Sequence, residues 1–230
     1  MNLDKCTSGA GVITFLAIFG VVFVLELLFA FLEKQTARKI VKPFVMLSLL
    51  GLALCYDCSV SMIWVYLGII FGLAGDVFLI FPRNDTIFSL GAFAFFIGHV
   101  FYMVQMVLMV GEDFSFVIPI IWAALIVSYF LCTFRISKKI SQNLFIRIGM
   151  ILYTGTLLVM LVTSVTFSFM GWARYLILVY AGYIFFIGSD IYLIYVNFIK
   201  HQKREDFYIM GTYMAAQFLI VFGLLLTSSI

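Results

Sequence analysis

Long, nearly continuous apolar runs alternate along the chain with short polar stretches. The hydrocarbon core of a bilayer is about 30 Å thick, and an α-helix needs about 20 apolar residues to cross it. The pattern therefore predicts an all-α, polytopic membrane protein with eight transmembrane helices in a single domain over residues 1–230. The expected helices run over about 11–32, 43–56, 62–81, 87–110, 114–134, 145–169, 174–198 and 207–226. A transmembrane β-barrel is excluded, because its strands would appear as short alternating segments.

The composition supports a membrane protein. Of the 230 residues, 65% are hydrophobic and only 11% are charged, and the mean hydropathy is +1.18. Soluble domains are about half apolar and about a quarter charged. These values exclude a soluble enzyme, a disordered chain and a disulfide-stapled secreted domain. The formal net charge of +3 is too small to indicate nucleic acid as a partner.

The basic residues gather on one side of the predicted membrane. Twelve of the fourteen lie in or near the connections after the first, third, fifth and seventh helices: Lys34, Arg38, Lys39, Lys42, Arg83, Arg135, Lys138, Lys139, Arg147, Lys200, Lys203 and Arg204. Only Lys5 and Arg174 fall on the other side. Because lysine and arginine favour cytoplasmic loops, both termini are expected to face away from the cytoplasm. A bacterial inner membrane and an endoplasmic reticulum would show the same bias.

Four ionisable residues lie inside the predicted helices: Glu26, Asp76, His99 and Asp190. A charged side chain in the bilayer core is costly, so each of these residues is a candidate functional residue. At 1.5 Å per residue, Asp76 and Asp190 lie about 9–10 Å from the cytoplasmic ends of their helices. Tyr153, Thr154, Tyr213 and Gln217 fall in the same half of the membrane. The shared depth predicts a polar cavity that opens toward the cytoplasmic leaflet.

Each of these residues also has a purely structural explanation. A buried Asp can cap a broken helix or bond to a Ser, and a buried His can bond to a backbone carbonyl. Glu26 can reach water or Lys34, and Tyr213 and Gln217 can join helices to one another. The common depth of the groups is what favours a functional site.

The segments around the two Asp residues resemble each other. Residues 68–80 and 182–194 share the Gly at −8, the Phe at −5, the Asp, and the Leu-Ile at +3 and +4. Both run in the same direction through the membrane, four helices apart. The match predicts two parallel four-helix halves, each of which supplies one carboxylate.

Two carboxylates in one apolar cavity are suited to general acid–base catalysis. Burial favours the neutral form of a carboxylic acid, and a neighbouring carboxylate favours it further in one member of a pair. One group can then donate a proton while the other stays ionised, as in glycosidases. His99 would tune or relay the proton.

Other chemistries have weaker support. Asp76, His99 and Asp190 could supply three metal ligands, but no HxxxH or HExxH spacing is present. Ser189 with His99 could form a serine hydrolase, but there is no GxSxG motif. Cys55 and Cys58 form a CxxC, which is compatible either with a redox pair or with two ordinary small residues.

A series of short motifs runs through the chain in order: Val41-Lys42-Pro43, Gly75-Asp76 with Leu79 and Pro82, Gly98-His99-Val100-Phe101-Tyr102, Tyr153 with Met160, Ser189-Asp190, and Tyr213-Met214-Ala215-Ala216-Gln217-Phe218-Leu219-Ile220. In these motifs, from about residue 38 to 226, the chain resembles the lysoplasmalogenase family of YhhN-like membrane proteins. The resemblance implies a membrane hydrolase that needs no cofactor. Its substrate would be a lysophospholipid with a vinyl ether at sn-1, and its products a fatty aldehyde and glycerophosphoethanolamine or glycerophosphocholine.

The predicted site suits this reaction, in which the vinyl ether is protonated at carbon and water then adds to an oxocarbenium ion. Asp76 and Asp190 would act as acid and base, with Asp190 slightly favoured as the acid because its neighbours Phe185, Phe186 and Ile187 are apolar. His99 would orient or relay. The expected substrate-binding residues are Glu26, Lys42, Arg83, Tyr102, Tyr153, Tyr213 and Gln217, of which Lys42 and Arg83 would meet the phosphate.

The alternative function is a proton-coupled transporter or translocator of lysolipid. Transporters often contain Gly/Pro-broken helices near the midplane. The helices that carry Asp76 and Asp190 contain Gly but no internal Pro, which favours the hydrolase. Membrane lipids are the other expected partners, and the sequence does not indicate an oligomeric state.

Overall fold

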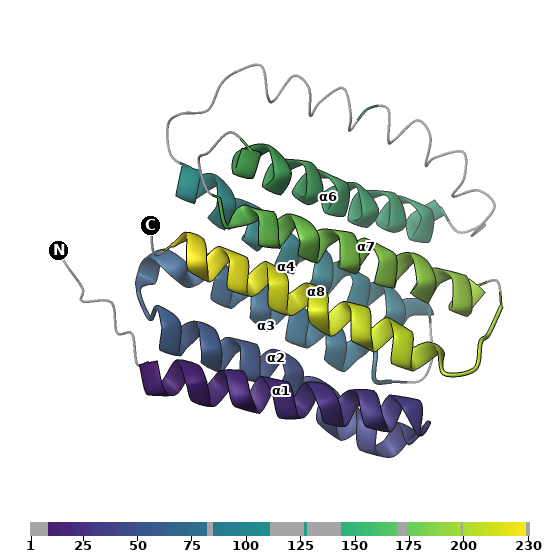
Figure 1. Cartoon of the computed structure of the whole chain (residues 1–230). Coiled ribbons are helices and arrows are strands. Elements are labelled where there is room, and N and C mark those ends of the chain that lie inside the picture. Colours follow the sequence, from purple (N-terminus) through teal and green to yellow (C-terminus); the bar gives the residue numbers. More distant parts are fainter. Residues whose placement is uncertain are drawn as a thin grey trace.

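The computed structural model describes residues 9–81, 85–110, 127, 144–169, 174–198 and 200–228. Their regular elements are all helical (Figure 1): α1 (Gly9–Phe31), α2 (Gln35–Tyr56), the short 3₁₀ helix η1 (Val60–Met62), α3 (Ile63–Phe78), α4 (Asp85–Val110), α6 (Leu144–Phe169), α7 (Leu176–Phe198) and α8 (Glu205–Thr227). Seven helices, with η1 and α3 taken as one, are long and apolar enough to cross a membrane. The described part of the chain is therefore that of an all-helical integral membrane protein. The predicted helix over 114–134 lies outside the described residues.

The predicted helix ends agree with the observed ones within three residues, except at the start of α2. We expected residues 34–42 to form a loop and the helix to begin at Pro43, but α2 begins at Gln35 and contains Pro43. The chain turns sharply at Glu33, whose φ is 56°. The Lys34 N–H donates to Phe29 O at 2.9 Å and the Glu33 N–H to Ala30 O at 3.2 Å, the pattern of a Schellman motif. The polar residues after this turn thus belong to the first turns of a helix.

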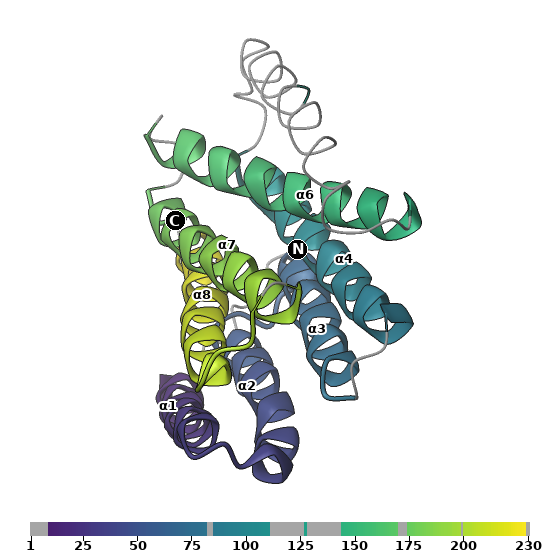
Figure 2. The ribbon, with the colours of Figure 1, turned by 90° about the vertical axis from the view of Figure 1, so that its right-hand side faces the viewer.

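Six of the described helices form a ring. In the order α2, α3, α4, α6, α7, α8, each contacts the next, and α8 closes on α2 (Figure 2). Helix α1 lies outside the ring, against α2 and α8. The helices that carry Asp76 and Asp190, α3 and α7, stand on opposite sides of the ring, so both can reach a shared interior.

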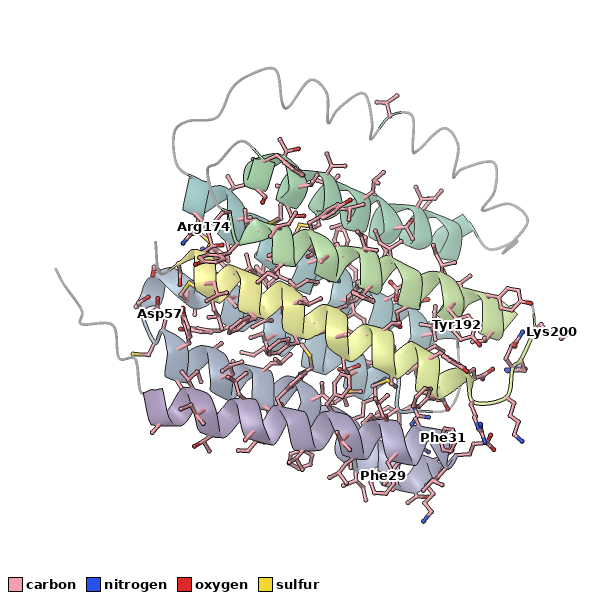
Figure 3. All side chains as sticks on the ribbon, viewed as in Figure 1. Phe29, Phe31, Asp57, Arg174, Tyr192 and Lys200 are labelled. Carbon is pink, nitrogen blue, oxygen red and sulfur yellow. The ribbon has the colours of Figure 1, made fainter. Side chains whose placement is uncertain are left out.

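The two ends of the bundle differ in charge. Asp57 and Arg174 lie at one end, called here the far end, where α1 begins and α8 ends (Figures 1 and 3). Lys200 lies at the opposite end, where α2 also begins (Figure 3). We call this the basic end, and its described cations are Lys34, Arg38, Lys39, Lys42, Lys200, Lys203 and Arg204.

Glycines set the spacing of the closest helices. A methyl group on Gly182 of α7 would lie 2.9 Å from the backbone oxygen of Ala216 in α8. On the other side of the ring, a methyl on Gly98 of α4 would lie 3.0 Å from the backbone oxygen of Gly68 in α3. Small residues let helix backbones approach closely inside a membrane, where helix association depends on such packing.

The α7–α8 contact predicts a stability difference between two glycines of α7. Gly182→Ala should lower the free energy of unfolding by about 1–3 kcal/mol, because the methyl has backbone in its way. Gly188→Ala is the matched control, since nothing lies within 4 Å of its added methyl. It should gain up to about 1 kcal/mol from helix propensity. Thermal unfolding in detergent measures both, and equal melting temperatures would contradict the packing described.

Candidate active site

A cavity of about 1070 Å³ opens at the basic end of the helix ring. Its wall is largely apolar and includes Phe78, Leu79, Phe93, Phe95, Phe96, Leu152, Phe186 and Leu193. Its polar lining residues are Gln35, Arg38, Lys39, Lys42, Asp76, Thr86, Ser89, Tyr153, Thr154, Ser189, Asp190, Glu205, Asp206 and Tyr213. A large apolar pocket with a few convergent polar groups is typical of a small-molecule site.

Asp76 joins three helices at the cavity. Its side chain on α3 is 1% exposed. Lys42 of α2 places its Nζ 3.4 Å from Asp76 Oδ1, and the Tyr213 hydroxyl of α8 donates to Oδ2 at 2.7 Å. Asp76 therefore has a counter-ion and a hydrogen-bond donor inside the membrane, as a buried carboxylate requires.

Asp190 faces the same cavity from α7 with a different set of partners. The Tyr153 hydroxyl of α6 donates to Asp190 Oδ2 at 2.6 Å. Among the described residues, no cation forms an ion pair with Asp190. The neighbouring Ser189 donates its hydroxyl to Ile209 O at 3.0 Å and so ties α7 to α8. The two carboxylates thus each accept a tyrosine hydroxyl, and in the described part of the chain a lysine pairs with Asp76 but not with Asp190.

A second group of charges closes the ring between α2 and α8. Arg38 of α2 is buried, and its Nε lies 3.1 Å from Glu26 Oε1 of α1. Its Nη1 forms an ion pair with Asp206 of α8 and donates to Gln35 Oε1 at 3.2 Å. Gln35 also donates to Asp206 Oδ2 at 2.9 Å. We call Glu26, Gln35, Arg38 and Asp206 the Arg38 cluster; it ties α1, α2 and α8 together one turn before Lys42.

Three expected site residues lie behind the cavity and do not line it: His99, Tyr102 and Gln217. All three are 1% exposed. His99 Nδ1 bonds to the Tyr183 hydroxyl at 3.1 Å, and its ring meets Phe186 edge-on at 4.6 Å between centroids. His99 and Ser189 therefore bond to other groups and do not form the pair that a serine hydrolase would use.

The other expected residues divide as follows. Lys42, Tyr153 and Tyr213 line the cavity as expected. Glu26 is fully buried, bonds to Arg38 rather than to Lys34, and is not among the residues that line the cavity. Arg83 lies outside the described residues.

Sequence reasoning missed Arg38, Gln35 and Asp206 as neighbours of the site. The signal was the spacing of Arg38 and Lys42, which is one helical turn. The hydropathy pattern predicts a loop over residues 34–42, and in a loop a spacing of four residues does not place two side chains on one face.

The described residues contain no group of three or more His, Cys, Asp or Glu placed to hold a metal ion. Cys55 is partly buried and Cys58 exposed, and both are free thiols. Cys55 lies in the last turn of α2, at the far end of the bundle, and neither cysteine lines the cavity. The polar groups that line the described part of the cavity are carboxyl, hydroxyl, amide, amine and guanidinium groups.

Comparison with known families gives one match. The model of the YhhN family matches residues 37–224. The matched part includes Lys42, Asp76, Tyr153, Asp190 and Tyr213, and it leaves out α1 with Glu26. Searches of curated proteins and of solved structures give no match.

The Arg38 cluster predicts an asymmetric response to substitution. Arg38→Met should cost about 3–5 kcal/mol of stability, because it leaves the Glu26 carboxylate buried without its cation. Glu26→Gln combined with Arg38→Met should recover part of that loss, since a neutral amide then replaces the carboxylate that lost its cation. The exposed Lys34→Met is the control and should change stability by less than about 0.5 kcal/mol. Unfolding in detergent tests this; a double variant no more stable than Arg38→Met would show that the buried ion pair is not what matters.

Proposed function

The chain belongs to the YhhN family, and on that premise we propose that it is a membrane hydrolase that cleaves the sn-1 vinyl ether bond of a lysoplasmalogen. The family includes lysoplasmalogenases. The products would be a fatty aldehyde and glycerophosphoethanolamine or glycerophosphocholine. The observation that carries the proposal is the pair of carboxylates in one large apolar cavity, of which one is paired with a lysine and the other with none of the described cations.

The difference between the two carboxylates supports an assignment of roles. Within the described residues no cation pairs with Asp190 to stabilise a negative charge, so it is the group better suited to carry the proton that the reaction needs. Asp76, with Lys42 beside it, is better suited to remain ionised and to act as the base. Tyr153 and Tyr213 fix the orientation of the two carboxyl groups through their hydroxyls.

The reaction then runs in three steps with all protons accounted for. Asp190 transfers its proton to the outer vinyl carbon and gives an oxocarbenium ion. Water adds to the cationic carbon and loses a proton to Asp76, which forms a hemiacetal. The carbon–oxygen bond to glycerol breaks as Asp76 returns that proton to the glycerol oxygen, and the hemiacetal hydroxyl proton goes to Asp190. Both carboxyl groups end as they began.

The cavity also suits the substrate's two parts. Its apolar wall can hold the alkenyl chain. At the mouth, Lys39 and Lys42 are the lysines that line the cavity within the described residues, and they would meet the phosphate. Arg38 already has three acceptors in its cluster, so we do not assign it to the phosphate.

Removal of either carboxylate should abolish most of the activity. Asp76→Asn and Asp190→Asn should each lower the rate of aldehyde release from a vinyl-ether lysolipid by about 10²–10⁴-fold. Asp57→Asn is the matched control, because Asp57 is as deeply buried but lies at the far end, outside the cavity. It should keep full activity. The assay uses pure protein in detergent, with alkyl-ether and ester lysolipids alongside.

Three results would contradict this assignment. Full activity in either cavity variant, with folding verified by melting temperature, would remove that residue from the mechanism. Movement of intact lysolipid across proteoliposome membranes, with no aldehyde formed, would instead support the transporter alternative. Loss of activity in EDTA would point to a metal-dependent reaction.

The charge asymmetry supports a cytoplasmic position for the basic end, so that substrate would arrive from the cytoplasmic leaflet. Exposed Cys58 near the far end and exposed Lys203 at the basic end allow a test. In intact cells, a membrane-impermeant thiol reagent should label a chain whose only cysteine is Cys58. A chain whose only cysteine comes from Lys203→Cys should be labelled only after permeabilisation. The reverse pattern would place the cavity on the other side.

A further inference from the structure

Directly behind the cavity, three buried polar atoms have no hydrogen-bond partner. Within the described residues, five such side-chain atoms occur: Glu26 Oε2, His99 Nε2, Tyr102 OH, Gln105 Oε1 and Gln217 Oε1. Of these, Glu26 belongs to the Arg38 cluster and Gln105 lines a separate hollow, whereas His99, Tyr102 and Gln217 lie behind the cavity. We call these three residues the polar layer.

Contacts place the polar layer together. The rings of His99 and Tyr102, on successive turns of α4, lie 6.0 Å apart. Tyr102 packs on α3 at Gly68, where an added methyl would fall 2.2 Å from its ring. Gln217 reaches the same face of α3 one turn further on, since its Nε2 lies 4.0 Å from the methyl position of Gly72. Tyr102 of α4 and Gln217 of α8 thus approach one strip of α3, and the ring of His99 lies next to that of Tyr102.

The polar layer adjoins residues that bond to the reacting carboxylate or line the cavity. Gln217 follows Tyr213 by one turn of α8, and Tyr213 donates to Asp76. His99 contacts Phe186, whose ring lines the cavity. A molecule held by the polar layer would therefore sit beside the base assigned above.

The chemistry of the three atoms suits water. An unpaired buried polar group destabilises a protein, and native proteins satisfy such groups with ordered water that makes about three hydrogen bonds. The Gln217 oxygen accepts, the Tyr102 hydroxyl donates or accepts, and His99 Nε2 does either according to its tautomer. Each of the three atoms can therefore pair with a water molecule.

We propose that His99, Tyr102 and Gln217 hold the water that adds to the oxocarbenium ion. The inference rests on the proposed function, in which a lipid chain fills the cavity and displaces water from its apolar wall. Water behind the carboxylates stays in place when the substrate binds. It forms the new carbon–oxygen bond and gives its proton to Asp76, so these three are positioning residues that act through it.

Two conservative variants test the proposal. Tyr102→Phe removes one hydroxyl and Gln217→Leu one amide, and neither residue lines the cavity. Each should lower kcat by about 10- to 100-fold with little change in KM. Gln105→Leu is the matched control: it removes an equally buried, unpartnered amide on α4, which lines a separate hollow of about 410 Å³ that also includes Thr227 at the end of α8. It should retain wild-type kinetics.

A product ratio distinguishes water placement from general damage. With a little methanol present, the oxocarbenium ion is divided between water, which gives aldehyde, and methanol, which gives a mixed acetal. The wild-type protein should give aldehyde almost alone, whereas Tyr102→Phe and Gln217→Leu should raise the acetal fraction several-fold. The ratio does not depend on how much protein is active.

Each outcome decides the question. If both variants give the same acetal fraction as the wild-type protein, the proposal is overturned. It is also overturned if Tyr102→Phe has a higher melting temperature and an unchanged kcat, because the polar layer would then hold no water. A rise in KM alone would assign the residues to substrate contact and also overturn it. Failure of the proposed function would look different, because the wild-type protein would then release no aldehyde.

Discussion

A lipid bilayer offers no water to a polar side chain in its core, so each ionisable group there needs partners from within the protein. The Lys42–Asp76–Tyr213 contact meets this requirement with residues from α2, α3 and α8. None of these helices could hold its polar side chain in the bilayer core without the other two helices. The closure of the helix ring between α2 and α8 therefore depends on the same contact that builds one half of the candidate site.

The Arg38 cluster extends this principle to the cavity mouth. Arg38 is buried and shared between Glu26 on α1 and Asp206 on α8. By holding the start of α2 in place, it fixes the position from which Lys42 reaches Asp76. Glu26 lies on α1, outside the region that the family model matches. A helix outside that region therefore supports residues inside it.

The pattern of apolar residues was sufficient to locate most helices, because about 20 apolar residues in a row have one stable arrangement in a bilayer. It failed at α2, whose first turns are polar. A polar stretch between two apolar runs usually indicates a loop, but here Gln35, Arg38 and Lys42 face partners on other helices. The helical spacing of these residues reflects partners on other helices, which only the tertiary structure shows.

The sequence by itself determined the class of protein, the position of most helices and the identity of the costly groups Asp76 and Asp190, because composition and hydropathy are local properties. The tertiary structure decided how these groups differ. Asp190 bonds to Tyr153, which is 37 positions away, and Asp76 to Tyr213, which is 137 positions away. It also placed His99, Tyr102 and Gln217 behind the cavity instead of on its wall. Depth along a helix can be counted from the sequence, but the direction in which a side chain points depends on which helices surround it.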